Sequence, residues 1–157
     1  MNKVYNKVID FGRKYPGSIT WRLRQHSEVV EKHLNPGEIV KYVFVGQKND
    51  RAFDIFSTGV LAITNERILI GRKRVVFGYA LDSVMPYMYN DLNIRTRIIW
   101  GKVVIDTIKE EIVFSNIDKK AMDEIETNIS KNMMELKKKY PKQESRDREE
   151  YKKDDEK

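Results

Sequence analysis

Three consecutive basic residues, Arg72, Lys73 and Arg74, form the strongest charge cluster within the predicted strands. They stand in "GRKRVV", between two apolar runs that are typical of strands. A turn that carries two or three such groups can bind one phosphate or an anionic surface, because guanidinium and ammonium groups donate charge-assisted hydrogen bonds. The same charges are also typical of a solvated turn that discourages pairing between sheet edges.

Four more basic residues would widen this positive surface if their connections lie at one end of the fold. Lys48 and Arg51 follow the first predicted strand, and Arg95 and Arg97 follow the fifth. These four and the basic turn are our candidate site for an anionic ligand or surface. The sequence does not show whether the connections lie together.

Catalytic and metal chemistry have little support elsewhere in the sequence. His26 and His33 are seven residues apart, whereas metal-binding pairs on a helix are usually spaced by three or four, and no cysteine or carboxylate cluster completes a ligand set. No nucleophile or glycine-rich phosphate loop accompanies the carboxylates near the strand ends, which are Asp106, Glu110, Glu111 and Asp118. No G-x-S-x-G, G-x-x-x-x-G-K or H-E-x-x-H pattern occurs. We therefore predict no metal, no cofactor and no enzymatic activity.

The polar residues at 64–67 interrupt the apolar run "VLAITNERILI". Glu66 beside Arg67 could indicate acid chemistry or a turn. Asn65 tolerates positive φ, and the apolar alternation resumes directly after Arg67. The segment is therefore predicted to be a hairpin corner.

Two helices are predicted before the strands. Val4, Val8, Phe11 and Tyr15 recur at helical spacing, and "YPGS" breaks this amphipathic helix. A second helix is predicted over 19–34, where Ser18 would cap its first amides and "NPG" would end it.

From Glu38 the apolar spacing changes to that of strands. Because no helical pattern intervenes, the strands should form an antiparallel meander. Helical spacing returns after Asp118, the predicted N-cap, and continues to Tyr140; this helix could close the open end of a bent sheet. The predicted strands cover 38–45, 53–64, 67–72, 75–80, 84–89, 98–107 and 111–115.

Composition limits the class of protein. The 157 residues suit one domain, and the absence of cysteine excludes disulfides and thiol chemistry. No apolar stretch approaches the roughly 20 residues that span a bilayer, and the N-terminus lacks the layout of a signal peptide. We expect a cytoplasmic protein, with contact at the membrane periphery as an option. The net charge is +6, and residues 1–34 hold most of the positive excess.

The element order resembles that of pleckstrin-homology-like (PH-like) domains, in particular a bacterial branch of that superfamily. The resemblance covers about residues 34–136 and is carried by "LNPGE", "GVLAITNERILI", "YALDSV", "IIWGKVVIDT" and "IVFSNIDKKAMDEIETNI". It implies a mainly β fold with helices: a bent antiparallel seven-stranded sheet or barrel capped by a C-terminal helix and here preceded by N-terminal helices. The phosphoinositide signature K-x-n-R-x-R is not clearly present, since Asp50 and Asp54 accompany Lys48 and Arg51, so the resemblance transfers a fold and not a ligand.

We therefore predict three segments: an N-terminal helical extension over 1–34, a PH-like domain with its C-terminal helix over 35–140, and a charged, disordered tail over 141–157. The predicted function is that of a non-enzymatic binding or adaptor module for a protein partner or an anionic membrane surface. The alternative is a structural subunit of a homo-oligomer, with the N-terminal helices at the protomer interface. Nucleic-acid binding is disfavoured, because the strands have aromatic residues but no RNP-like motif.

Overall fold

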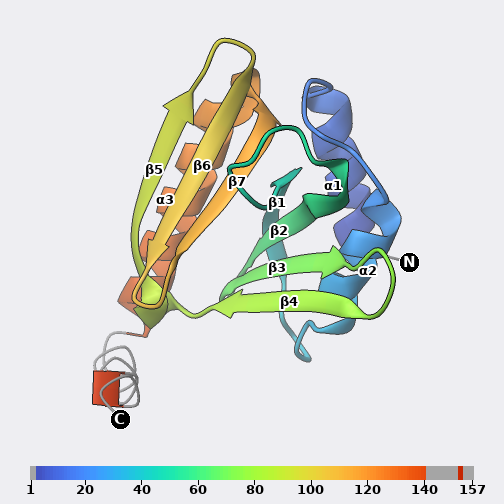
Figure 1. Ribbon diagram of the computed structural model, residues 1–157. Helices are drawn as coiled ribbons and strands as arrows, with labels where there is room; N and C mark the ends of the chain where they lie inside the picture. Colours follow the sequence, from blue (N-terminus) through green and yellow to red (C-terminus); the bar gives the residue numbers. More distant parts are fainter. Residues whose placement is uncertain (1–2, 141–151, 154–157) are drawn as a thin grey trace.

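The computed structural model describes residues 3–140 and 152–153, so the predicted tail over 141–157 lies almost entirely outside the described residues (Figure 1). Seven antiparallel strands form one sheet in the order β4-β3-β2-β1-β7-β6-β5. Strands that follow each other in the chain are paired, except β4 and β5, which are the two edges of the sheet, and β1 joins β7 through Gln47 opposite Ser115. The strands are β1 (Val40–Gln47), β2 (Thr58–Thr64), β3 (Ile68–Lys73), β4 (Tyr79–Val84), β5 (Tyr89–Thr96), β6 (Trp100–Thr107) and β7 (Glu111–Asp118).

The sheet curls into a half-barrel, because the short β1–β7 junction lets the β1–β4 half and the β5–β7 half turn away from each other (Figure 1). Phe44 and Phe114 meet inside this bend, with their rings edge to face at 5.2 Å. The predicted bent antiparallel sheet is confirmed.

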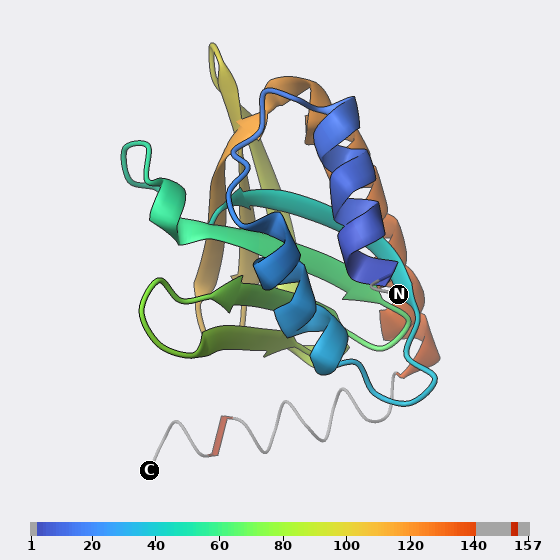
Figure 2. The ribbon, with the colours of Figure 1, turned by 90° about the vertical axis from the view of Figure 1, so that its right-hand side faces the viewer.

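Within residues 3–140, the helices α1 (Lys3–Lys14), α2 (Leu23–Lys32) and α3 (Met122–Lys139) pack with this sheet. Figure 2 shows α1 and α2 in front of the β1–β4 half, while α3 lies across the other half. Val4 and Val8 of α1 are fully buried in the same core as the strands, so the sheet of the chain itself covers the apolar face of this helix. The domain boundary at residue 34 stays a prediction.

The α2 helix can lie close to the sheet because β3 has a glycine beneath it. A Cβ atom at Gly71 would come within 2.6 Å of the Val30 side chain and 3.2 Å of the His26 carbonyl oxygen. Any larger residue would push α2 outward, so this glycine is needed for the close approach of helix and strand.

Two predicted strands were misplaced. The segment over 75–80 is mostly the β3–β4 connection, and β4 begins only at Tyr79. The segment over 84–89 contains a 3₁₀ turn, Pro86–Met88, and β5 follows from Tyr89 to Thr96. Proline has no amide hydrogen for a strand ladder and favours the start of a helical turn, which explains the second error.

The second helix is shorter than predicted, and Ser18 does not cap it. The Ser18 hydroxyl accepts a hydrogen bond from the Asp118 amide at 2.9 Å, and the Ile19 amide donates to the Asn116 carbonyl at 2.9 Å. These bonds tie the segment after α1 to the end of β7. The helix begins only after Arg22, which has a left-handed backbone with φ 51°.

The start of the C-terminal helical segment was predicted correctly. The Asp118 carboxylate accepts a hydrogen bond from the Lys120 amide at 3.0 Å. This cap begins a 3₁₀ turn, Lys119–Ala121, which continues directly into α3.

The predicted hairpin corner between β2 and β3 is confirmed. The Thr64 hydroxyl accepts hydrogen bonds from the amides of Glu66 and Arg67, both at 3.0 Å, and the Thr64 amide donates to the Arg67 carbonyl at 2.9 Å. The Arg67 guanidinium is paired with Glu38, whose side chain is fully buried. The charges of this corner therefore have a structural role.

Candidate functional site

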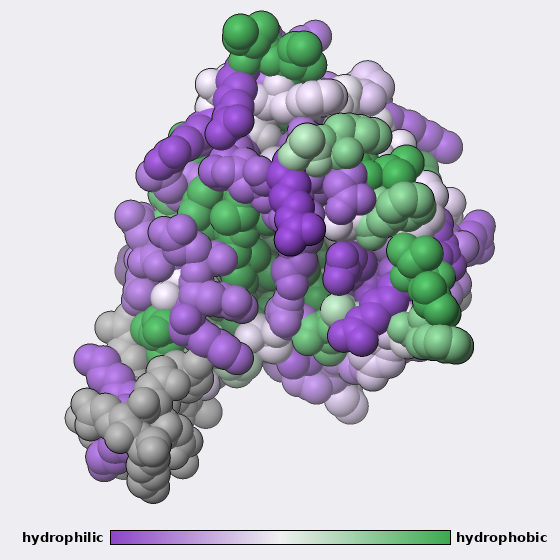
Figure 3. All heavy atoms as spheres, viewed as in Figure 1, coloured by the Kyte–Doolittle hydropathy of each residue, from purple (hydrophilic) through white to green (hydrophobic). Residues whose placement is uncertain are grey.

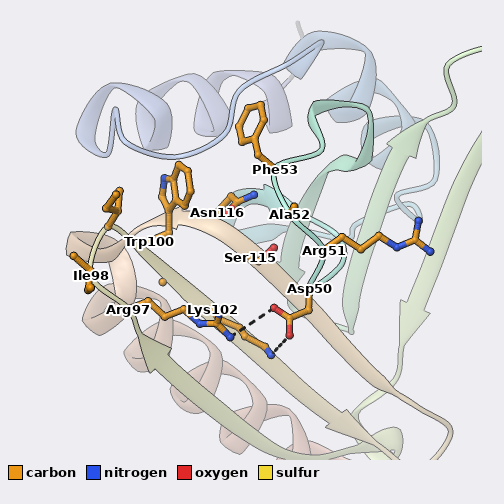
Figure 4. Close-up of a pocket in the computed structure, with 12 residues that line it drawn as sticks. Asp50, Arg51, Ala52, Phe53, Arg97, Ile98, Trp100, Lys102, Ser115 and Asn116 are labelled. Carbon is orange, nitrogen blue, oxygen red and sulfur yellow. Dashed lines mark hydrogen bonds and ion pairs between the residues drawn. The ribbon is translucent and has the colours of Figure 1, made fainter.

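The candidate site is a pocket of about 430 Å³ between the β1–β2 connection and the β5–β6 hairpin (Figure 4). It lies where the end of β1 meets β7, at one edge of the bend in the sheet. Its lining residues are Asp50, Arg51, Ala52, Phe53, Arg97, Ile98, Ile99, Trp100, Gly101, Lys102, Ser115 and Asn116.

A fully buried glutamine, Gln47, shapes the β1–β2 connection that forms one wall. Its amide group donates to the carbonyls of Arg51 and Ala52 at 3.2 and 3.1 Å. Its side-chain oxygen accepts from the Asp54 amide at 2.8 Å and from Asn116 at 2.6 Å. One buried side chain therefore holds the loop to both β1 and β7, because each of these groups would otherwise lack a partner away from water.

The charged floor of the pocket consists of a carboxylate between two cations. Lys102 Nζ donates to Asp50 Oδ2 at 2.5 Å, and Arg97 Nη2 lies 3.9 Å from Asp50 Oδ1. The hydrogen bond from Lys102 holds the pKa of Asp50 below its ordinary value, so this carboxylate is ionised at neutral pH. The Lys102 side chain is only 11% exposed, whereas that of Asp50 is 43% exposed.

Apolar side chains form the rim above these charges. The Phe53 and Trp100 rings lie nearly parallel, with centroids 6.3 Å apart, and Trp100 Nε1 donates to the Gly17 carbonyl at 3.2 Å. Ile98, at the hairpin tip, is 90% exposed and Ile99 is 66% exposed. The pocket thus combines an ionic floor with an apolar rim open to solvent.

Our seven predicted site residues fall into separate groups. Arg51 and Arg97 line the pocket, whereas Lys48 of the same connection forms an ion pair with Asp82 of β4. Arg95 lies within β5 instead of after it, beside a second, mixed-charge depression on the β5–β7 face. Of the four basic residues outside the basic turn, the loops therefore bring together only Arg51 and Arg97.

The basic turn is also placed differently from the prediction. Arg72 and Lys73 are the last residues of β3, opposite Ala80 and Tyr79, and only Arg74 belongs to the connection. Arg74 is exposed, while Arg72 and Lys73 are partly covered.

The two histidines have different surroundings, and both have structural contacts. Buried His26 accepts a hydrogen bond from the Lys73 amide at 2.8 Å, and burial, aided by nearby Arg22 and Arg72, lowers its pKa to about 4. The ring of His33 contacts the Tyr79 hydroxyl at 3.1 Å. Within residues 3–140 and 152–153, no three His, Cys, Asp or Glu side chains are grouped as a metal site would need.

Sequence reasoning missed the exposed apolar residues at three connections. The β1–β2 connection exposes Phe53 and Phe56, and the β5–β6 hairpin exposes Ile98 and Ile99. The β3–β4 connection exposes three such residues in succession, of which Phe77 is 84% exposed. In Figure 2 the β1–β2 and β3–β4 connections project at the left and the β5–β6 hairpin points upward at the top, and Figure 3 shows apolar groups at the β5–β6 tip and along the β3–β4 edge. The signal in the sequence was the apolar residues directly after Arg or Lys in "RAF", "KRVVF" and "RIIW".

A curled, seven-stranded antiparallel sheet with one helix across its end defines a PH-like domain, a class that generally comprises non-catalytic binding modules. A family model described as "Bacterial PH domain" matches residues 34–131. The chain belongs to this bacterial PH domain family.

Solved structures similar to this chain include the following two. One is a DUF1696 family protein with a pleckstrin-homology domain from Shewanella loihica PV-4, at 13% identity and TM-score 0.42, which covers 74% of this chain and 98% of that chain. The other is a pleckstrin homology domain from Shewanella amazonensis SB2B, at 11% identity and TM-score 0.44, which covers 82% of this chain and 96% of that chain. No curated protein matches the chain. Among the helices described here, none has the length and apolar character to cross a membrane.

Proposed function

We propose that the protein is a non-catalytic PH-like module that docks on an anionic membrane surface through the tips of three connections. One observation carries the proposal: the β1–β2, β3–β4 and β5–β6 connections each expose a large apolar side chain within two residues of an arginine. Basic groups contribute about 1 kcal/mol each near an anionic leaflet, and apolar side chains gain by entering the boundary between headgroups and acyl chains.

The exposed apolar side chains are divided among three separate connections, and this arrangement favours a membrane over a protein partner. The centre of a typical protein interface is a contiguous area depleted of charged residues. Here the apolar groups are on separate protruding tips, and each tip has its own cation, Arg51, Arg74 or Arg97. A soft, anionic layer can accommodate all three tips, whereas a protein would have to provide three matched pockets.

The homo-oligomer alternative has less support. It places the N-terminal helices between protomers, but Val4, Val8 and Phe11 of α1 already pack in the core of the same chain. Little apolar surface on these positions is left for a second copy.

The proposal is tested by co-sedimentation with vesicles of phosphatidylcholine, with and without phosphatidylglycerol. Changing Arg51, Arg74 and Arg97 to Glu should weaken binding to the anionic vesicles by about a hundred-fold or more, since each lost cation removes about 1 kcal/mol. Added salt should reduce the difference, because it screens exposed charges. All three side chains are exposed, so the fold should not change.

The matched control changes Lys109, Lys131 and Lys138 to Glu, which alters the net charge equally at exposed positions away from the three tips. It should retain most of the binding. If the unaltered protein ignores anionic vesicles at low salt, the membrane proposal is wrong and a protein partner becomes the leading function.

A further inference from the structure

We propose that the outer face of β5–β7 binds a second copy of the chain, in a two-fold dimer held by ion pairs between Asp91 of one copy and Arg95 of the other. The inference goes beyond the membrane proposal and does not rest on it, because no residue of this face belongs to the three tips. It also differs from the homo-oligomer alternative, since the N-terminal helices take no part in it.

The face is the side of β5–β7 that is turned away from the core. It contains the depression of about 350 Å³ beside Arg95. Val103, Ile105 and Phe114 point inward to the core, so the residues that alternate with them point outward. In Figure 1 the strands lie in front of α3, and Figure 3, from the same side, shows apolar groups over β6 and β7 bordered by hydrophilic ones. The helix therefore covers the inner side of these strands and leaves the outer side open.

Three rows of outward side chains cross the face, in the order acidic, uncharged and basic. The uncharged row lies two residues from each charged row, so the opposite charges are placed symmetrically about it. The centre of a protein interface is typically depleted of charge in the same way. Read from the strand register, the rows are Asp91 with Asp106, then Asn93 with Val104 and Val113, then Arg95 with Lys102.

The acidic row lacks a counter-charge within the chain. Asp91 and Asp106 lie directly opposite each other, an arrangement of like charges that destabilises a sheet. Neither carboxylate forms an ion pair with a cation among the described residues. A cation from outside would therefore offset a repulsion that the fold itself leaves in place.

A second copy of the same face has the matching cations at the matching distance. A two-fold axis that lies in the face, perpendicular to the strands and along the uncharged row, sets each strand antiparallel over its own copy. Asp91 then faces Arg95, and Val104 faces the same valine of the other copy. Arg95 is exposed and can reach the facing carboxylate, whereas Lys102 is already bonded to Asp50. Because such an interface is isologous, each contact occurs twice.

The extent of the face predicts a weak dimer. Stable interfaces involve about 20–30 residues on each side, and the outer face of three short strands provides fewer. Dimers should therefore form only toward high chain concentration and at low salt, where exposed charges are least screened.

The test measures sedimentation velocity of the full chain from micromolar to millimolar concentration at low salt. Arg95→Glu should raise the dissociation constant of the dimer at least about tenfold, because it replaces two attractive contacts by two repulsive ones. Lys131→Glu is the matched control, since it changes the net charge equally at an exposed position on α3 and should leave the dimer unchanged. Arg95 is exposed, so the thermal transition of the variant should match that of the unaltered protein.

Exchange of the two charges is the decisive experiment. Asp91→Arg alone should weaken the dimer as Arg95→Glu does, whereas the two changes in one chain should restore it, because each new arginine faces a new glutamate. An equal mixture of the two single variants should form a heterodimer that neither variant forms by itself. Restoration and heterodimer formation do not follow from net charge or from a structural role of either residue within one chain.

Three results would overturn the inference. The unaltered protein could remain monomeric at every concentration in low salt, which would leave the face to a different protein. The doubly exchanged chain could stay as weak a dimer as the single variants, which would place the contact between copies on another surface. A change in the sedimentation of Arg95→Glu that does not depend on concentration would mean that the chain covers this face itself.

Discussion

At the scale of single residues, Glu38 connects the segment before β1 to the corner between β2 and β3. Its carboxylate accepts from Arg67 Nε and Nη2, both at 3.1 Å, and from the Thr64 hydroxyl at 2.7 Å. The Asn35 amide donates a further bond at 2.8 Å. Burial by itself would raise the pKa of Glu38, but the hydrogen bonds from Arg67, Asn35 and Thr64 outweigh burial and keep this pKa below its ordinary value.

This lowered pKa predicts a loss of stability in acid. A carboxylate with a lower pKa in the folded state stabilises the fold fully above its unfolded pKa, and this contribution is lost as the pH falls through the folded pKa. Glu38→Gln should lower the free energy of unfolding at neutral pH by about 3–5 kcal/mol, because it leaves Arg67 without its buried partner. It should also show a smaller further loss between about pH 5 and pH 3 than the unaltered protein.

Urea denaturation at a series of pH values measures both effects. Glu111→Gln, at an exposed position at the start of β7, serves as the control and should behave like the unaltered protein. Equal acid sensitivity in Glu38→Gln and the unaltered protein would show that other carboxylates cause the loss.

At the scale of elements, α3 closes the half-barrel with one apolar stripe. Ile125, Ile129 and Met133 are fully buried, while Met134 on the opposite face is 59% exposed. The sequence predicted that one face of this helix is apolar and buried, because residues three and four positions apart lie on the same face of a helix.

The packing of this stripe predicts the cost of shortening a side chain. Ile125→Ala should reduce the free energy of unfolding by about 2–5 kcal/mol, since it removes buried methyl groups and leaves a cavity. Met134→Ala on the same helix should change it by less than about 0.5 kcal/mol. Denaturant midpoints report both values, and similar losses in the two variants would mean that α3 does not pack through this face.

At the scale of the whole molecule, the N-terminal helices are held by the β1–β4 half of the sheet. Val4 and Val8 are fully buried, and Phe11 and Tyr15 are nearly so. Each buried side chain of this size contributes about 1.5–3 kcal/mol, so α1 accounts for a large share of the marginal stability of a domain.

Removing residues 1–17 should therefore abolish or greatly lower the cooperative thermal transition seen by far-ultraviolet circular dichroism. Replacing the exposed Lys3 and Lys7 by Gln leaves the apolar face intact and should preserve the transition. A truncated chain that keeps its sheet but changes its oligomeric state would instead support the homo-oligomer alternative.

Much of the fold was predictable from local patterns. The number and type of elements followed from the spacing of apolar residues, because each helix or strand must direct those residues to one side. Two strand predictions were wrong. Pro86 begins a 3₁₀ turn where the apolar run predicted a strand, and the apolar residues at 75–77 lie in an exposed connection instead of a strand. These exposed residues at 75–77 are part of the surface through which we propose that the protein contacts a membrane.

The sequence by itself determined the antiparallel PH-like order of strands, the closing helix, the corner at Thr64 and the absence of recognised catalytic motifs. Only the tertiary structure decided which charges share a site. Asp50 and Lys102 are 52 residues apart and Gln47 and Asn116 are 69 apart, and each pair meets because the β1–β7 junction bends the sheet. The sign and spacing of charges along the chain cannot reveal such pairs, since the curvature of the sheet arises from packing among residues distant in the sequence.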